Sequence, residues 1–192
     1  EEELQRDLSA AKIWRAAAES LGWESTDAAL LRSTDAGDTN VARPARGASF
    51  ARVRYQVSTS GNTSYSVSGL WVAPTGPLQS SRGTVLWFHG TETSRKQCVG
   101  CQIRQDNSVE RAMSSSNVIA LFAVLSQLGF HVLAPDGLGL GDSTAPFQAY
   151  LDREHTAIVA VEMLRALHST LNLRDGSAWP AAGHVWLLGG SH

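Results

Sequence analysis

Three short apolar runs constrain the fold of this chain more than any other feature of its sequence. They cover residues 84–88, 130–134 and 184–188. A continuous apolar run of this length is typical of a strand that is buried on both faces of a sheet. Helical patterns at 117–128 and at about 152–171 separate the three runs. This alternation predicts a parallel sheet with helices on both faces, which is an α/β fold.

A hairpin is expected before the first apolar run. Apolar and polar residues alternate from 50 to 57 and again from 65 to 73, on either side of a turn at Ser60, Gly61 and Asn62. Alternation of this kind is typical of strands with one buried face, and the turn residues predict a direct antiparallel connection. The expected sheet therefore begins with two antiparallel strands and continues with three parallel ones.

The first 48 residues carry a different pattern. An amphipathic helix is predicted over 3–21 from apolar residues at helical spacing, namely Leu4, Leu8, Ala11, Trp14, Ala18 and Leu21. A shorter helix is expected over 27–33. Residues 34–48 combine Gly, Pro, Asp and Thr, a composition typical of a linker. We therefore expect a helical extension and linker at 1–48 and the sheet within 49–192.

Composition excludes several classes of protein. The chain has 16 Lys and Arg against 18 Asp and Glu, a formal net charge of -2, so no basic surface for nucleic acid is expected. Its apolar runs are far shorter than the ~20 residues that span a bilayer, so no transmembrane segment is expected. The start at Glu1 lacks the basic and apolar parts of a signal peptide.

The segment after the third apolar run carries a candidate nucleophile. Gly189, Gly190, Ser191 and His192 match four of the five positions of the G-x-S-x-G pattern, in which the serine lies on a tight strand-to-helix turn. A serine hydroxyl is a weak nucleophile, so it needs a histidine to take its proton and an acid to orient that histidine. The alternative is a glycine turn that only ends the strand and has no catalytic role.

The first apolar run ends in a candidate oxyanion turn formed by His89, Gly90 and Thr91. The carboxyl ends of parallel strands meet at one edge of a sheet, so this turn should lie near Ser191. Two backbone N–H groups must stabilise the oxyanion of an acyl-transfer intermediate. We expect one from His192 and the other from Gly90 or Thr91. The His89 ring is expected to brace the turn and not to act as the base.

The second apolar run ends in Pro135 and Asp136, followed by glycines at 137, 139 and 141, whose alternate spacing predicts a tight loop. Phosphate binding by this loop is disfavoured, because it has no Lys or Arg and matches neither G-x-G-x-x-G nor the P-loop. Asp136 precedes Ser191, whereas the acid follows the serine in enzymes with this type of serine turn. We therefore expect Asp136 to have a structural role, in which it accepts hydrogen bonds from N–H groups of the loop.

Together, the ends of the three apolar runs resemble the alpha/beta-hydrolase superfamily. Residues 68–70, 86–91 and 134–143 are most similar to the secretory lipase-type esterases, which have an HGT oxyanion turn and a PDYLGLG loop. The resemblance covers residues 50–192. The chain differs at Gly137, where those esterases usually have an aromatic residue, and at His192, where they usually have Gln or Met. Prolyl-oligopeptidase-like hydrolases share the same core.

The resemblance implies the sheet order 1-2-4-3-5-6-7-8 and a catalytic acid and histidine that follow strands 6 to 8. Residues 49–192 would then be the N-terminal part of a catalytic domain, with the C-terminal part of the fold missing or on a second chain. The implied function is hydrolysis of small-molecule or lipid esters through an acyl-enzyme on Ser191, without a cofactor. The fragment is expected to be inactive, and poorly soluble because its fifth strand is an apolar edge. The alternatives are a non-catalytic hydrolase-fold binding protein and a prolyl-oligopeptidase-like peptidase.

Cys98 and Cys101 form a C-x-x-C pair in the loop after the oxyanion turn. A zinc site needs four ligands, and no second pair with suitable spacing exists, so no metal site is expected. The sequence leaves open whether the two cysteines form a local disulfide, as an exported protein would allow, or two free thiols. Asn62, Thr63 and Ser64 form a glycosylation sequon at the expected hairpin tip, which favours an extracellular protein.

Overall fold

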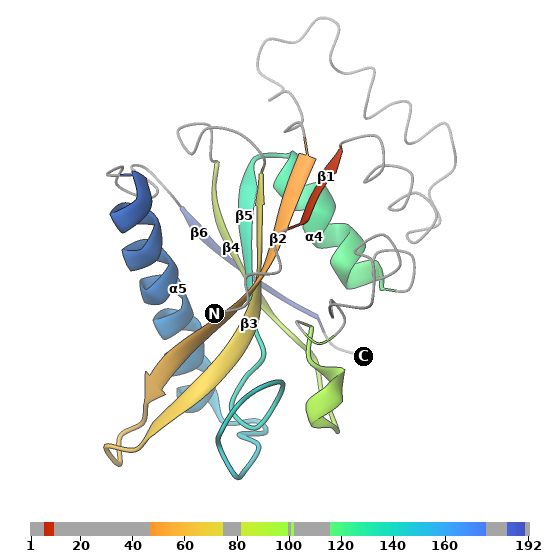
Figure 1. The fold of residues 1–192 in the computed structure, drawn as a ribbon. Helices are drawn as coiled ribbons and strands as arrows, with labels where there is room; N and C mark the ends of the chain where they lie inside the picture. Colours follow the sequence, from red (N-terminus) through yellow and green to blue (C-terminus); the bar gives the residue numbers. More distant parts are fainter. Residues whose placement is uncertain are drawn as a thin grey trace, which may run out of the picture.

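The computed structural model describes residues 6–9, 47–74, 82–99, 101, 116–175 and 184–190. Two long antiparallel strands, β2 (Gly47–Ser58) and β3 (Ser64–Pro74), form the predicted hairpin, with Val53 opposite Gly69. The predicted turn between them contains Asn62, whose φ is 57°. Figure 1 shows this hairpin as a long twisted ribbon that extends beyond the rest of the sheet.

The three apolar runs form the strands β4 (Gly83–Phe88), β5 (Phe130–Pro135) and β6 (Val185–Gly189). The sheet has the order β1-β2-β3-β5-β4-β6, with β4 parallel to both β5 and β6. Counted from the hairpin, this order is 1-2-4-3-5, as the resemblance implied. The α/β fold class and the strand order are thus confirmed.

Two helices cover opposite faces of this sheet (Figure 1). Helix α4 (Asn117–Gln127) packs Ile119 and Phe122 against Val85 and Trp87 of β4. Helix α5 (Arg153–Asp175) contributes to a second core. This core contains Leu86, which lies between Val85 and Trp87 in β4. Because successive strand residues point to opposite faces, the continuous apolar run 84–88 serves both cores at once.

Short polar side chains start both helices. The Ser116 hydroxyl accepts a hydrogen bond from the Ile119 N–H (3.4 Å) at the start of α4. One carboxylate oxygen of Asp152 accepts the N–H groups of Glu154 (3.0 Å) and His155 (3.1 Å) at the start of α5. These bonds satisfy N–H groups that have no partner within the helix. Gly129, with φ of 92°, follows the last turn of α4 in a conformation that favours glycine.

The predicted helix over 3–21 is wrong at Arg6–Ser9, which form strand β1. This strand pairs antiparallel with β2, with Arg6 opposite Phe50. Pairing with an available sheet edge outweighs the helical spacing of the apolar residues here, since local patterns are only weak determinants of structure. The rest of that helix, the helix over 27–33 and most of the linker lie outside the described residues.

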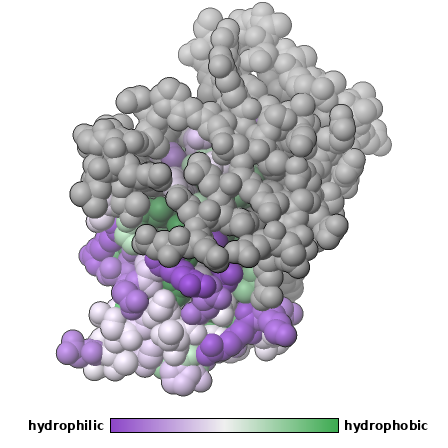
Figure 2. All heavy atoms as spheres, viewed as in Figure 1, coloured by the Kyte–Doolittle hydropathy of each residue, from purple (hydrophilic) through white to green (hydrophobic). Residues whose placement is uncertain are grey.

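Residues 184–188 form the exposed apolar edge that was expected of the fifth strand, whereas the expectation that this run is buried on both faces is wrong for this chain. Trp186 is 56% exposed and Leu187 is 71% exposed, and β6 is the last strand in the order of the described sheet. The hairpin tip, at the lower left in Figures 1 and 2, is in contrast neutral to hydrophilic. Among the residues that the structure describes, no helix has the length and apolar character of a membrane span.

Candidate active site

A cavity of about 330 Å³ lies where the carboxyl ends of β4, β5 and β6 meet. The end of β4 contributes His89, Gly90 and Thr91 to its lining, and the end of β6 contributes Gly190. Leu138 and Val159 add apolar surface from the loop after β5 and from α5. The parallel strands thus bring the predicted oxyanion turn and the residue before the predicted nucleophile to one cavity. Ser191 and His192 lie outside the described residues.

Gly190 is held close to the oxyanion turn by the sheet itself. Its N–H donates to the Phe88 carbonyl (3.1 Å), which extends the pairing of β6 with β4 by one residue. A β-carbon at position 190 would lie 2.8 Å from a carbon of the Trp87 ring. A side chain is therefore excluded here, which explains the glycine directly before Ser191.

Two contacts fix the conformation of the candidate oxyanion turn. The His89 ring donates from Nδ1 to the Gly90 carbonyl (2.7 Å), so the ring braces the turn as predicted. The Thr91 hydroxyl lies 3.3 Å from the Tyr150 hydroxyl, which links the turn to the loop after β5. The Gly90 carbonyl thus accepts a hydrogen bond from the His89 ring, and Gly90 and Thr91 line the cavity.

The loop after β5, residues 136–150, is here named the glycine loop. Gly137, Gly139 and Gly141 all have positive φ values (80°, 83° and 56°), so the predicted tight loop is confirmed. At Gly141, a β-carbon would lie 2.5 Å from the Ser68 hydroxyl and 2.7 Å from an Asp136 carboxylate oxygen. At Gly137, it would lie 3.4 Å from the His89 ring, where the resembled esterases usually have an aromatic side chain.

Asp136 is fully buried at the base of the glycine loop. It accepts a hydrogen bond from the Ser68 hydroxyl (2.6 Å), and the same hydroxyl accepts the Asp142 N–H (3.0 Å). The Asp136 N–H donates to the Ser68 carbonyl (3.0 Å). These bonds tie β3 to both ends of the turn 136–142, which is a structural role. The Ser68 hydroxyl is thus one donor to the Asp136 carboxylate, and hydrogen bonds from N–H groups of the loop stay a prediction.

Asp142 forms an ion-pair cluster with two arginines of β2, and no local pattern in the sequence predicts this cluster. Its carboxylate lies 2.9 Å from Arg52 and 2.7 Å from Arg54. Burial alone would raise the pKa of Asp142, but the hydrogen bonds and positive charges of Arg54 and Arg52 hold that pKa below its ordinary value. The glycine loop is thereby fastened to the hairpin by charge as well as by hydrogen bonds.

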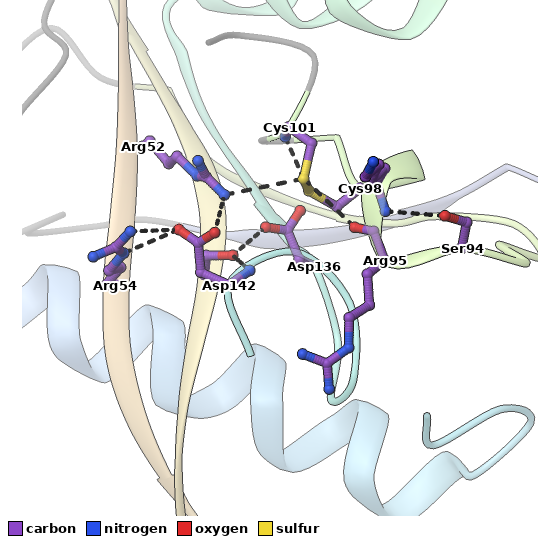
Figure 3. Close-up of a disulfide and its surroundings, with 10 residues drawn as sticks. Arg52, Arg54, Ser94, Arg95, Cys98, Cys101, Asp136 and Asp142 are labelled. Carbon is purple, nitrogen blue, oxygen red and sulfur yellow. Dashed lines mark hydrogen bonds and ion pairs between the residues drawn. A yellow bond between two sulfur atoms is a disulfide. The ribbon is translucent and has the colours of Figure 1, made fainter. Parts of the chain in front are cut away.

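Cys98 and Cys101 are joined in a disulfide, which decides between the two states that the sequence left open. Both cysteines are buried, and Leu140 of the glycine loop packs against them. Figure 3 shows the disulfide beside the side chains of Arg52, Asp142 and Asp136. Within the described ranges, no group of three or more His, Cys, Asp or Glu side chains is placed to hold a metal ion.

No protein-family model and no curated protein was found to match the chain. Solved structures do resemble it. A protein from Legionella pneumophila assigned as a hydrolase has a TM-score of 0.66 at 20% identity, over 97% of this chain and 42% of its own. The cell wall degrading esterase LipA from Xanthomonas oryzae, in a ligand-bound form, has a TM-score of 0.59 at 25% identity, over 84% and 37%. Candida antarctica lipase A has a TM-score of 0.52 at 15% identity, over 74% and 30%.

These likenesses, together with the strand order, show that the chain has the alpha/beta-hydrolase fold. The chain spans less than half the length of each of these three proteins. Its sheet ends at β6, and its cavity lies at the carboxyl edge, the position of ligand sites in open α/β sheets.

Proposed function

We propose that this chain carries the nucleophile and the oxyanion hole of a serine hydrolase that acts on carboxylic esters. One observation carries the proposal: the cavity at the carboxyl edge is lined both by Gly90 and Thr91 and by Gly190, the residue directly before Ser191. Esterases and a lipase among the solved structures with this fold support the choice of an ester as substrate.

In the proposed reaction, the Ser191 hydroxyl oxygen attacks the ester carbonyl while a histidine takes its proton. The carbonyl oxygen becomes an oxyanion, which accepts hydrogen bonds from the N–H of His192 and from that of Gly90 or Thr91. Collapse of the intermediate releases the alcohol with the proton from the histidine and leaves an acyl group on Ser191. Water then attacks this acyl-enzyme, and the acid is released.

The histidine base and its acid are proposed to lie outside residues 1–192, in a later part of the protein or on a second chain. Asp136 does not fit the role of the acid, because it is fully buried and bonded to Ser68. His89 is not proposed as the base, because its Nδ1 donates to the carbonyl of Gly90 in its own turn, where the histidine of a triad donates to the orienting carboxylate. Loss of a catalytic partner lowers kcat by orders of magnitude, so residues 1–192 alone are expected to show no turnover.

The test is covalent labelling and turnover in the full-length protein that contains this sequence. A fluorophosphonate should label the wild type at Ser191 and should not label Ser191→Ala, whose kcat/KM on a nitrophenyl ester should fall at least about a thousandfold. Ser60→Ala, at the exposed hairpin turn, is the matched control and should retain both properties.

Three results would contradict the proposal in different ways. Undiminished turnover by Ser191→Ala would exclude Ser191 as the nucleophile. Absence of labelling and turnover in a folded wild-type protein would favour a non-catalytic binding protein instead. Cleavage of aminoacyl amides in preference to esters would indicate a peptidase of the prolyl-oligopeptidase type.

A further inference from the structure

The segment that carries the oxyanion turn runs on from β4 to the disulfide, and we name residues 89–99 the oxyanion strap. The strap has little regular structure of its own beyond the short helix η3 (Arg95–Gln97). Its conformation therefore depends on contacts with the neighbouring glycine loop. Any motion along the strap would displace the backbone N–H groups of Gly90 and Thr91.

Arg95 makes the most contacts between the strap and the glycine loop. Its guanidinium donates to the carbonyl oxygens of Ser143 (2.9 Å) and Ala145. Its own carbonyl accepts the N–H of Gly141 (3.0 Å). Nearer the oxyanion turn, the Gln148 amide donates to the Glu92 carbonyl (2.7 Å). The glycine loop thus holds the strap at several points between the turn and the disulfide.

The disulfide lies at the far end of the strap and packs directly on Arg95. The Cys101 N–H donates to the Cys98 sulfur (2.9 Å), and the Cys101 sulfur lies 3.6 Å from the Arg95 carbonyl oxygen (Figure 3). A β-carbon at Gly141 would lie 3.1 Å from the Cys98 sulfur, so the disulfide also fills the space beneath the glycine loop. The two cysteines are only 1% and 7% exposed.

We propose that the Cys98–Cys101 disulfide keeps the oxyanion hole in its active conformation and that its reduction disturbs this conformation. We call this redox-sensitive element the latch, and Arg95 is the positioning residue through which it acts. This inference rests on the proposed function. A disulfide between residues three apart removes little entropy from the unfolded chain, so its main effect is local. Without the bond, the two sulfurs must separate to van der Waals contact within a filled site. They would then displace Arg95 or Leu140.

Reduction needs a dithiol, which is the co-reactant of the proposed switch. Two electrons and two protons pass from the dithiol to the protein, so that the S–S bond is replaced by thiols on Cys98 and Cys101 and the dithiol becomes a cyclic disulfide. Because the sulfurs are buried, the dithiol reaches them only after local opening of the strap. The change is therefore expected to be slow and reversible.

The test measures kcat and KM of the full-length protein before and after treatment with dithiothreitol. Iodoacetamide labelling of a separate sample, followed by mass spectrometry, reports the state of the two thiols. Complete loss of an oxyanion donor costs about 10²–10³ in kcat. A displaced donor should cost less, and we expect kcat to fall about tenfold with KM unchanged within about twofold. Re-oxidation should restore kcat.

Variants separate the latch from a general effect on folding. The double variant Cys98→Ser/Cys101→Ser should show the lowered kcat without reductant and should not respond to dithiothreitol. Arg95→Gln should lower kcat with little change in KM, whereas Lys96→Gln, the adjacent exposed residue of η3, should match the wild type. If the double variant does not fold, the reduced wild type still tests the latch.

Unchanged kcat in protein whose Cys98 and Cys101 are both labelled would overturn the latch. So would a loss of kcat that only accompanies unfolding, seen as a cooperative change in circular dichroism. Failure of the proposed function looks different, because Ser191→Ala would then retain the activity of the wild type in either redox state.

Discussion

At Gly139, the absence of a single carbon atom allows the glycine loop to close. The residue has φ of 83°, and a β-carbon would lie 2.6 Å from Cα of Gln148 and even closer to the Phe147 carbonyl oxygen. Both neighbours are backbone atoms, which cannot move aside as the end of a flexible side chain can. The loop that supports the oxyanion strap is therefore intolerant of any side chain at this position.

Gly139→Ala is accordingly expected to destabilise the protein by about 3 kcal/mol, from the left-handed backbone and the overpacking together. Gly61→Ala is the matched control, because nothing lies within 4 Å of a β-carbon at the hairpin turn. Its effect should stay within about 0.5 kcal/mol. Urea unfolding of the full-length protein measures both. Equal stability of the two variants would show that the loop relaxes around the new methyl group.

The sequence predicts some single-residue features and not others, and the reason is distance along the chain. The glycines at 137, 139 and 141 predicted a tight loop because their conformational freedom is an intrinsic property. The pairing of Arg52 and Arg54 with Asp142 joins residues about 90 positions apart, and nothing in the local sequence selects these partners. The C-x-x-C pair lies between these two cases in predictability, because its spacing allows a disulfide but does not require one.

Among the elements, strands β2 to β5 were predictable because each carries its own pattern of apolar residues and turns. Strand β1 was not, because its residues favour a helix in isolation and form a strand only against the edge of β2. The pairing of β3 with β5 also creates a contact between two side chains that no sequence pattern predicts. Trp71 of β3 stacks on His131 of β5, and its indole N–H donates to Nδ1 of the imidazole (3.3 Å).

This contact between strands predicts a pH dependence of stability. Burial lowers the pKa of His131 to about 4, and the bond from Trp71 requires Nδ1 to accept, which only the neutral ring can do. The unfolded chain binds a proton at its ordinary pKa of about 6.5, before the folded protein does. The stabilisation is therefore complete above about pH 6.5 and is lost as the pH falls towards 4, by up to about 3 kcal/mol.

Urea unfolding of the full-length protein between pH 7 and pH 4.5 measures this loss, and His131→Gln is the comparison. The variant should be less stable than the wild type at pH 7, and its stability should change less over the same range. Losses from carboxylates such as Asp142, whose pKa is lowered in the folded protein, occur in both proteins and cancel in this comparison. Parallel pH profiles for the two proteins would contradict the assignment to His131.

At the scale of the whole molecule, the strand order places the chemistry and also creates an exposed edge. The order was predictable because the resemblance covers the run from the hairpin to β6, and the structure confirms it. The position of β6 at the end of the sheet brings Gly190 to the cavity. The same position leaves Val185, Trp186, Leu187 and Leu188 exposed.

An apolar strand at the edge of a sheet is a template for pairing with another chain. Residues 1–192, expressed alone, are therefore expected to self-associate through β6. Leu187→Lys should increase the monomer fraction, because a charge on an edge strand opposes pairing. Val161→Lys is the matched control: it adds the same charge at an exposed apolar residue of α5 and should leave association unchanged. Size-exclusion chromatography with light scattering distinguishes these outcomes. A monodisperse wild-type monomer, or equal rescue by Val161→Lys, would show that β6 is not the surface through which the chains associate.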